Sequence, residues 1–294
     1  MNATDNDLAA GLDPLVLLLV NAFAIALLVG CLIAWSRHWR RSRAAVGQGA
    51  GLSPWQLSWL DAICIVGSAA ILIWFGQNAV AAAMQAYHGE DFDLSDPGLW
   101  TLIAFGLAVQ LPLLLIVCFG RLIFPNHFPR RFSENRMGLA ECLRWVADAY
   151  FRFLPLVMLV MLAWTLLLGV AAESGYIKQP QPQLLVTVFA FEDDWLARIA
   201  FFCLAVVVAP IAEELFFRGV LYRFLKEKFG LSLAMLSSAT LFAMVHGSLH
   251  AFLGLLVLGV LLSHVYEKSR DIRVPILFHA AFNLTSLLML SLVS

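Results

Sequence analysis

Long apolar stretches separated by short polar segments form the main pattern along the 294-residue chain. A membrane-spanning helix needs about 20 mainly apolar residues, and most of these stretches reach that length. We predict eight spans, at 14–35, 59–84, 99–124, 145–170, 198–224, 231–247, 249–266 and 274–292. A straight helix over 231–266 would be about 54 Å long, well beyond a hydrocarbon core of about 30 Å, so we expect a turn at Gly247 and Ser248. The pattern therefore predicts an all-α polytopic membrane helix bundle with about eight transmembrane helices.

The composition supports the same class. Hydrophobic residues make up 61% of the chain and charged residues 13%, whereas soluble domains contain about 25% charged residues. The five cysteines occur singly and no CxxC pattern is present, so neither a thiolate metal site nor a disulfide framework is expected. The net charge of -1 indicates no particular partner, and we expect none that is a nucleic acid.

Basic residues are distributed unevenly between the loops. Sixteen of the nineteen lysines and arginines lie in or beside alternate loops, after the first, third, fifth and seventh spans. The intervening loops carry acidic clusters at 90–96 and 192–194. Because loops rich in Lys and Arg remain in the cytoplasm, we predict that both termini face away from it.

The fifth predicted span contains three charged residues, in the stretch Ala-Pro-Ile-Ala-Glu-Glu-Leu-Phe-Phe-Arg-Gly at 209–219. Each charge near the centre of a membrane helix costs roughly 2.5–3.5 kcal/mol. Glu214 and Arg218 are four residues apart and can neutralise each other. Glu213 lies about 100° further around the helix and faces a different neighbour. Its partner must therefore come from another span.

Two later spans supply polar side chains. His246 ends the sixth span, while His279 and Asn283 lie four residues apart, and so on one face, in the eighth. Ionisable residues inside a membrane normally face the bundle interior or a wet cavity, so we expect Glu213, His246 and His279 to share one pocket. Counted along straight spans their depths differ by up to about 14 Å, so tilted or irregular helices must bring them together.

These residue types suit the activation of a water molecule. A carboxylate and an imidazole can hold and deprotonate water, and a second imidazole and an amide can donate hydrogen bonds to an oxyanion. Two histidines and a glutamate are also a ligand set of catalytic zinc. His250 is an alternative ligand four residues after His246, although Gly247 is expected to break the helix between them. Neither H-E-x-x-H nor G-x-S-x-G occurs, which argues against a conventional zincin or serine hydrolase.

Three motifs follow one another on the late spans: EExxxR at 213–218, FxxxH at 242–246 and HxxxN at 279–283. With these motifs, residues 199–292 resemble the CPBP family of intramembrane proteases. That family groups the CAAX-processing endopeptidase of the prenylation pathway with many bacterial relatives. The resemblance implies a helical membrane hydrolase that acts on peptide bonds.

The resemblance also implies roles for individual residues. The implied catalytic residues are Glu213, Glu214, Arg218, His246, His279 and Asn283. Within this set, Glu213 activates water with help from His246. His279 and Asn283 stabilise the oxyanion, and the Glu214–Arg218 pair supports the site. The family is described both as metal-dependent and as a glutamate-type protease. If a metal is bound, the resemblance implies zinc or another divalent ion held by Glu213, His246 and His279.

The predicted organisation has two parts. Residues 1–198 hold four spans and an interfacial segment at 184–191, and residues 199–294 form a catalytic core of four spans. The resemblance implies a bacterial inner-membrane endopeptidase whose partners are the lipid bilayer and a peptide, lipidated protein or membrane-protein substrate. Two other functions remain open at this stage: a scaffold or immunity protein without catalysis, and a proton-coupled transporter that uses the buried charges as a relay.

Overall fold

The computed structural model describes residues 25, 29–33, 36, 51–89, 97–123, 131–178 and 193–293. Most of the first predicted span and the predicted interfacial segment at 184–191 lie outside these residues. The elements in chain order are α3 (Trp59–His88), α4 (Leu99–Ile123), α5 (Leu139–Glu173), α7 (Trp195–Cys203), η2 (Leu204–Val208), α8 (Ala209–Glu214), η3 (Leu215–Tyr222), α9 (Arg223–Phe229), α10 (Leu231–Val245), α11 (Leu249–Ser269) and α12 (Arg273–Val293). Within the described residues the chain is therefore helical and contains no strand.

Five helical stretches of the described chain are long and apolar enough to cross a membrane: Trp59–Tyr87, Leu99–Gly120, Leu139–Glu173, Trp195–Phe229 and Leu249–Ser269. The apolar helices Leu231–Val245 and Arg273–Met289 are shorter. These helices confirm a polytopic membrane helix bundle. They also correct two predicted boundaries, because the fourth and fifth predicted spans begin earlier than expected, at Leu139 and Trp195.

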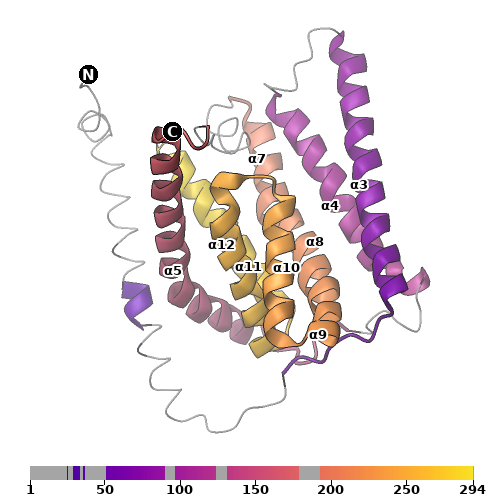
Figure 1. Cartoon of the computed structure of the whole chain (residues 1–294), viewed down its shortest axis with the longest axis vertical. Coiled ribbons are helices and arrows are strands. Elements are labelled where there is room, and N and C mark those ends of the chain that lie inside the picture. Colours follow the sequence, from indigo (N-terminus) through magenta and orange to yellow (C-terminus); the bar gives the residue numbers. More distant parts are fainter. Residues whose placement is uncertain are drawn as a thin grey trace.

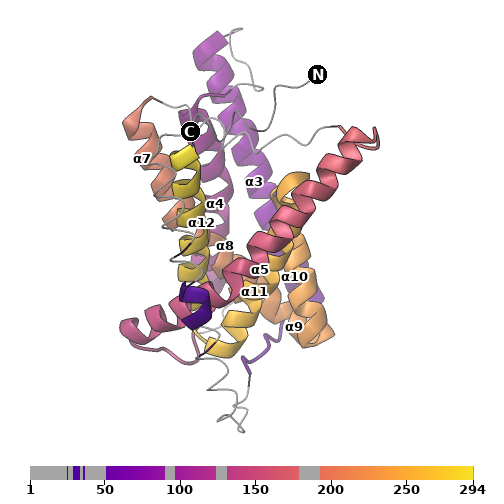
Figure 2. The same ribbon diagram turned by 90° about the vertical axis from the view of Figure 1, so that its left-hand side faces the viewer.

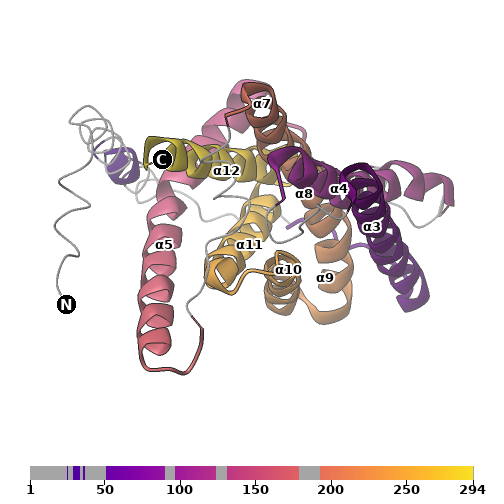
Figure 3. The ribbon, with the colours of Figure 1, turned by 90° about the horizontal axis from the view of Figure 1, so that it is seen from above.

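The bundle has two flanks and a centre. Helix α5 lies on one flank and the α3–α4 pair on the other, with α8, α11 and α12 between them (Figures 1 and 3). Buried side chains form one cluster that joins α3, α4, η3 and α10 and another that joins α5, α11 and α12. Figure 2 shows that α5 crosses the bundle obliquely. The centre of the bundle therefore holds α8, where the first sequence motif begins, and α12, which carries the third.

The predicted turn between the sixth and seventh spans is present. Helix α10 ends at Val245, and Gly247 follows with a φ of 62°, a left-handed conformation that glycine adopts without a Cβ clash. Ser248 then caps α11, because its hydroxyl accepts a hydrogen bond from the Ala251 N–H. His246 therefore lies at the C-terminal end of α10, at the turn into α11.

Trp195–Phe229 is one continuous helix whose hydrogen bonding changes along its length. Asp194 caps it by accepting hydrogen bonds from two N–H groups of the first turn. Two π-helical segments, η2 and η3, lie directly before and after the short segment α8. Pro210 in α8 has no N–H to donate into the preceding turn, which fits the widened turn at η2. π-helical segments occur often at functional sites, and here η2 and η3 flank Glu213 and Glu214.

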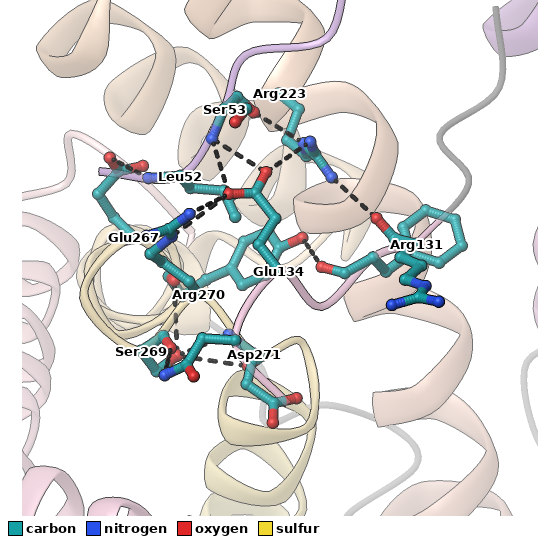
Figure 4. Close-up of polar contacts among 12 residues, drawn as sticks. Leu52, Ser53, Arg131, Glu134, Arg223, Glu267, Ser269, Arg270 and Asp271 are labelled. Carbon is teal, nitrogen blue, oxygen red and sulfur yellow. Dashed lines mark hydrogen bonds and ion pairs between the residues drawn. The ribbon is translucent and has the colours of Figure 1, made fainter. Parts of the chain in front are cut away.

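A network of polar side chains lies at the basic end of the bundle, the end that carries loops rich in Lys and Arg (Figure 4). Glu134 is its centre: its carboxylate accepts hydrogen bonds from Arg223 (3.0 Å), Arg270 (3.0 Å) and the Ser53 N–H (3.1 Å). Nearby, Glu267 accepts hydrogen bonds from Lys226 and Tyr222 and from the backbone N–H of the residue before Ser53. The network therefore joins the segment before α3, the loop before α5, α9 and the α11–α12 turn.

Asp271, in the α11–α12 turn, is the most enclosed carboxylate at this end. Its side chain is fully buried and accepts hydrogen bonds from Ser133 Oγ (2.8 Å), Arg273 Nη2 (2.5 Å) and the Met137 N–H (3.2 Å). Burial raises the pKa of Asp271, but these hydrogen bonds and that from the Arg273 N–H outweigh burial and lower the pKa from its ordinary 3.8 to about 2.

This lowered pKa predicts acid sensitivity. Because the folded pKa lies below the unfolded one, the stabilisation is present above about pH 4 and is lost as the pH falls toward 2. The unfolding temperature of the purified protein in detergent is therefore expected to fall over that interval. Asp271→Asn is expected to unfold at a lower temperature at pH 7 and to show a weaker dependence between pH 4 and 2. Asp193→Asn, at an exposed position, is the control, and an unchanged pH dependence in Asp271→Asn would refute the assignment.

Candidate active site

Glu213, His246 and His279 meet in the centre of the bundle. Glu213 lies on α8, His246 is the C-cap residue of α10, and His279 lies on α12. Glu213 Oε2 is 3.9 Å from His246 Nε2 and 3.9 Å from His279 Nε2. The structure thus places together the three side chains that straight spans would have left at different depths. The short α10, the irregular fifth span and the turn at Gly247 supply the required offsets.

Glu214 and Arg218 form a fully buried pair behind these residues. Arg218 Nη1 lies 2.8 Å from Glu214 Oε1, and both side chains have zero exposure. Arg218 Nη2 also donates to the Gly259 carbonyl on α11 (3.1 Å), and its guanidinium lies 4.5 Å from the centre of the Phe242 ring. Glu214 Oε1 accepts a further hydrogen bond from His279 Nδ1 (2.9 Å). The pair therefore links the first motif to α10, α11 and α12.

The hydrogen bonds at Nδ1 fix the tautomer of both histidines. His246 Nδ1 lies 2.7 Å from the Phe242 carbonyl oxygen, and His279 Nδ1 lies 2.9 Å from the Glu214 carboxylate. Because these oxygens only accept, Nδ1 carries the hydrogen in both rings. In the neutral rings both Nε2 atoms are then acceptors, and both face Glu213 Oε2, a buried acceptor without a hydrogen-bond partner in the described chain. The three atoms together can hold a molecule that donates hydrogen bonds.

The side-chain exposures differ across this group. His246 is 26% exposed, Glu213 is 11% exposed and His279 is 3% exposed. The more accessible side of the site is therefore the side of His246, next to the α10–α11 turn. Phe242 packs against both rings, with centroids 4.7 Å from His246 and 5.7 Å from His279, and holds their orientation.

Asn283 has a different contact from the one expected. Its amide nitrogen donates to the Ala205 carbonyl in η2 (2.8 Å), a segment whose widened turn alters the backbone hydrogen bonding. This contact holds α12 against the fifth span. The oxyanion role that the resemblance implied for Asn283 stays a prediction, and the described contact does not support it.

Gln110 is a contact of Glu213 that was not predicted from the sequence. This residue lies in α4 and is 7% exposed, and its amide nitrogen donates to Glu213 Oε1 over 2.8 Å. A single amide within the apolar third span was the available signal. Its partner could not be inferred, because 103 residues separate the two.

Two further histidines, His250 and His264, lie on α11. His250 is in the first turn of α11, beyond the break at Gly247. His264, also on α11, packs edge-on against Phe153, with ring centroids 5.9 Å apart. In the described part of the chain, no group of three or more His, Cys, Asp or Glu side chains is arranged to hold a metal ion. The metal ligation that the sequence left open for Glu213, His246 and His279 stays a prediction.

Close approach of the helices at Gly259 supports the position of Arg218. A Cβ at Gly259 would lie 2.8 Å from the Ala239 Cβ and 2.9 Å from its Cα, so α10 and α11 touch backbone to backbone here. Gly259→Ala is expected to reduce the free energy of unfolding by about 1–3 kcal/mol, because the helices must separate. Gly169→Ala is the control, since a Cβ there meets nothing within 4 Å. Equal unfolding temperatures for the two variants would contradict this packing.

Comparison with known proteins agrees with the geometry. A family model described as "Type II CAAX prenyl endopeptidase Rce1-like" matches residues 195–285. The "UPF0177 protein YbdI" of Lactococcus lactis subsp. lactis (strain IL1403) is 33% identical over 99 residues, which are 33% of this chain and 53% of that protein. The "Putative membrane peptidase YdiL" of Bacillus subtilis (strain 168) is 34% identical over 77 residues, which are 26% of this chain and 32% of that protein.

The family model covers the C-terminal part of the chain. No solved structure matches. The matched regions span about half of the first relative and a third of the second. The family model includes all three motifs and all six residues that the resemblance singled out. The resemblance to the CPBP proteases is thereby confirmed, and residues 195–285 are similar to the Rce1-like CAAX prenyl endopeptidases.

Proposed function

We propose that this protein is an intramembrane endopeptidase that hydrolyses a peptide bond of a membrane-associated or lipidated protein or peptide. The observation that carries the proposal is the convergence of Glu213 Oε2 with the Nε2 atoms of His246 and His279, each 3.9 Å away. These separations exceed a direct hydrogen bond but allow a water molecule to bridge the three atoms. The buried position supports a site for hydrolysis within the membrane.

In the proposed reaction Glu213 acts as the general base. Its Oε2 removes a proton from the water while the water oxygen attacks the carbonyl carbon, which gives a tetrahedral oxyanion and a protonated carboxyl group. Collapse of this intermediate breaks the C–N bond, and the proton passes from the carboxyl group to the leaving nitrogen. The products are one new carboxyl group and one new amine.

The histidines have distinct environments in this scheme. His279 is held from behind by the Glu214 carboxylate, which fixes the orientation of its ring. Its Nε2 atom, turned toward Glu213, accepts a hydrogen bond from the bound water. His246, at the more accessible edge, orients the water. Substrate therefore approaches past His246, from the side of the α10–α11 turn.

The same three side chains have the donor chemistry of a zinc site, and a bound zinc ion would supply a Lewis acid there. No step of the proposed reaction passes through a metal. The cellular location that we propose is the bacterial inner membrane, in line with the bacterial relatives, with both termini outside the cytoplasm as the basic loops predict.

The test is cleavage by the purified full chain in liposomes. The probes are quenched fluorescent peptides with an apolar membrane segment, prepared with and without a C-terminal farnesyl group, and products are identified by mass spectrometry. We expect cleavage by the native protein, none by Glu213→Gln, and undiminished cleavage with a chelator. Cleavage that persists in Glu213→Gln would exclude this site. The absence of cleavage of any peptide in the set would favour a scaffold, and loss of activity with a chelator, restored by zinc, would overturn the metal-free scheme.

A further inference from the structure

The family match covers residues 195–285, yet a residue from outside this region contacts the proposed base. Gln110 lies in α4, and its Nε2 donates to Glu213 Oε1 over 2.8 Å. Among the described residues, Gln110 is the hydrogen-bond donor to this carboxylate. It leaves Oε2, the oxygen between the two imidazoles, free for chemistry.

The face of α4 that carries Gln110 also packs closely against η2. Gly106 lies one turn before Gln110, and a Cβ at Gly106 would lie 2.7 Å from the Leu204 side chain of η2. Residues four apart share a face of a helix, so the missing side chain at Gly106 allows α4 to approach the fifth span where Gln110 reaches inward. Helix α4 also contacts α7, α8 and η3. The approach of α4 thus extends along the whole segment around Glu213.

A buried amide in an apolar span is costly unless it is hydrogen-bonded. Gln110 is 7% exposed, and its bond to Glu213 compensates part of that cost. A hydrogen bond to one carboxylate oxygen also restricts rotation of the group. Without it, Glu213 can turn about its terminal bond and lose the alignment of Oε2 with both Nε2 atoms.

We propose that Gln110 is a positioning residue for Glu213, so that α4, outside the family region, sets the orientation of the general base. The inference rests on the proposed function of Glu213. It implies that the N-terminal helices do more than anchor the protein in the bilayer. Removal of the amide is expected to slow the chemical step and to leave substrate binding unchanged.

The kinetic test compares substitutions that separate shape from hydrogen bonding. Gln110→Met retains the approximate shape and lacks a donor, whereas Gln110→His retains an N–H donor with a poorer shape match. We expect Gln110→Met to lower kcat about 10- to 100-fold at unchanged KM on the best-cleaved peptide of the set, the size of one hydrogen bond to a charged group. Gln110→His is expected to retain more of kcat. Thr101→Val, equally buried on the same helix, is the control.

A spectroscopic test does not depend on activity. The infrared difference spectrum between the native protein and Glu213→Gln identifies the carboxylate bands of Glu213. These bands are expected to shift in Gln110→Met and to stay in place in Thr101→Val. Thermal unfolding of each variant in detergent verifies that the protein is folded.

The outcomes separate the inference from the proposed function. A native kcat and unshifted bands in Gln110→Met, with Glu213→Gln inactive, would refute the positioning role alone. Shifted bands together with full activity in Glu213→Gln would support the contact but refute the proposed function. If Gln110→Met matched or exceeded Gln110→His in kcat, the amide would act through packing and the inference would be wrong.

Discussion

Glu213→Gln is expected to lower the rate of peptide-bond hydrolysis by a factor of about 10²–10⁴, the usual contribution of a general base. Glutamine has nearly the same shape as glutamate, and its amide cannot take a proton from water. The change leaves the Glu214–Arg218 pair and the hydrogen bond between His279 and Glu214 in place. The fold is therefore expected to survive while kcat falls. Initial rates at saturating peptide, measured with the protein in liposomes, provide the measurement.

Glu267→Gln is the matched control for this prediction. The Glu267 side chain is 9% exposed, close to the 11% of the Glu213 side chain, but it pairs with Lys226 and Tyr222 in the polar network at the basic end. The same chemical change there is expected to lower the unfolding temperature and to leave kcat unchanged below that temperature. Equal losses of kcat in the two variants would show that activity follows stability and not the base at position 213.

Arg218→Met is expected to reduce the free energy of unfolding by about 3–5 kcal/mol, because it leaves the Glu214 carboxylate charged inside the bundle with one partner fewer. Both side chains of this pair have zero exposure, so water cannot replace the lost partner. The substitution also removes the hydrogen bond to the Gly259 carbonyl and the contact with the Phe242 ring. Unfolding of the purified protein in detergent, followed by tryptophan fluorescence, measures the loss.

The double substitution Glu214→Gln with Arg218→Met separates the two contributions. It removes both charges, and most of the stability is expected to return, because a buried ion pair can often be replaced by neutral side chains at small cost. Activity is not expected to return, since His279 no longer has a carboxylate behind it. Arg270→Met, at a position where the arginine is 36% exposed, is expected to cost only about 0–1 kcal/mol. A loss below about 1 kcal/mol in Arg218→Met would contradict the importance of the buried pair.

The sequence alone determined the class of the protein and the identity of most polar residues of the site. Apolar stretches long enough to span a bilayer predict helices, because a backbone in lipid must satisfy its hydrogen bonds within the segment. The Glu214–Arg218 pair was also predictable, because residues four apart on a helix are neighbours whatever the rest of the chain does. The turn at Gly247 was predictable because a straight helix over 231–266 would be longer than the hydrocarbon core is thick. Each of these features depends on residues close together in the sequence.

The tertiary structure decided which of the distant groups meet. Gln110 and Glu213 are 103 residues apart, and His279 and Glu214 are 65 residues apart. These contacts therefore depend on how the helices pack and on the depth in the bundle at which each helix begins. The π-helical segments around α8 were equally hidden, because they arise from packing and hydrogen bonding rather than from a change in apolar pattern. Asn283 lies on the predicted face, yet its amide binds a backbone carbonyl that only the folded chain brings within reach. Local spacing therefore identified the side chains, and helix packing determined their partners.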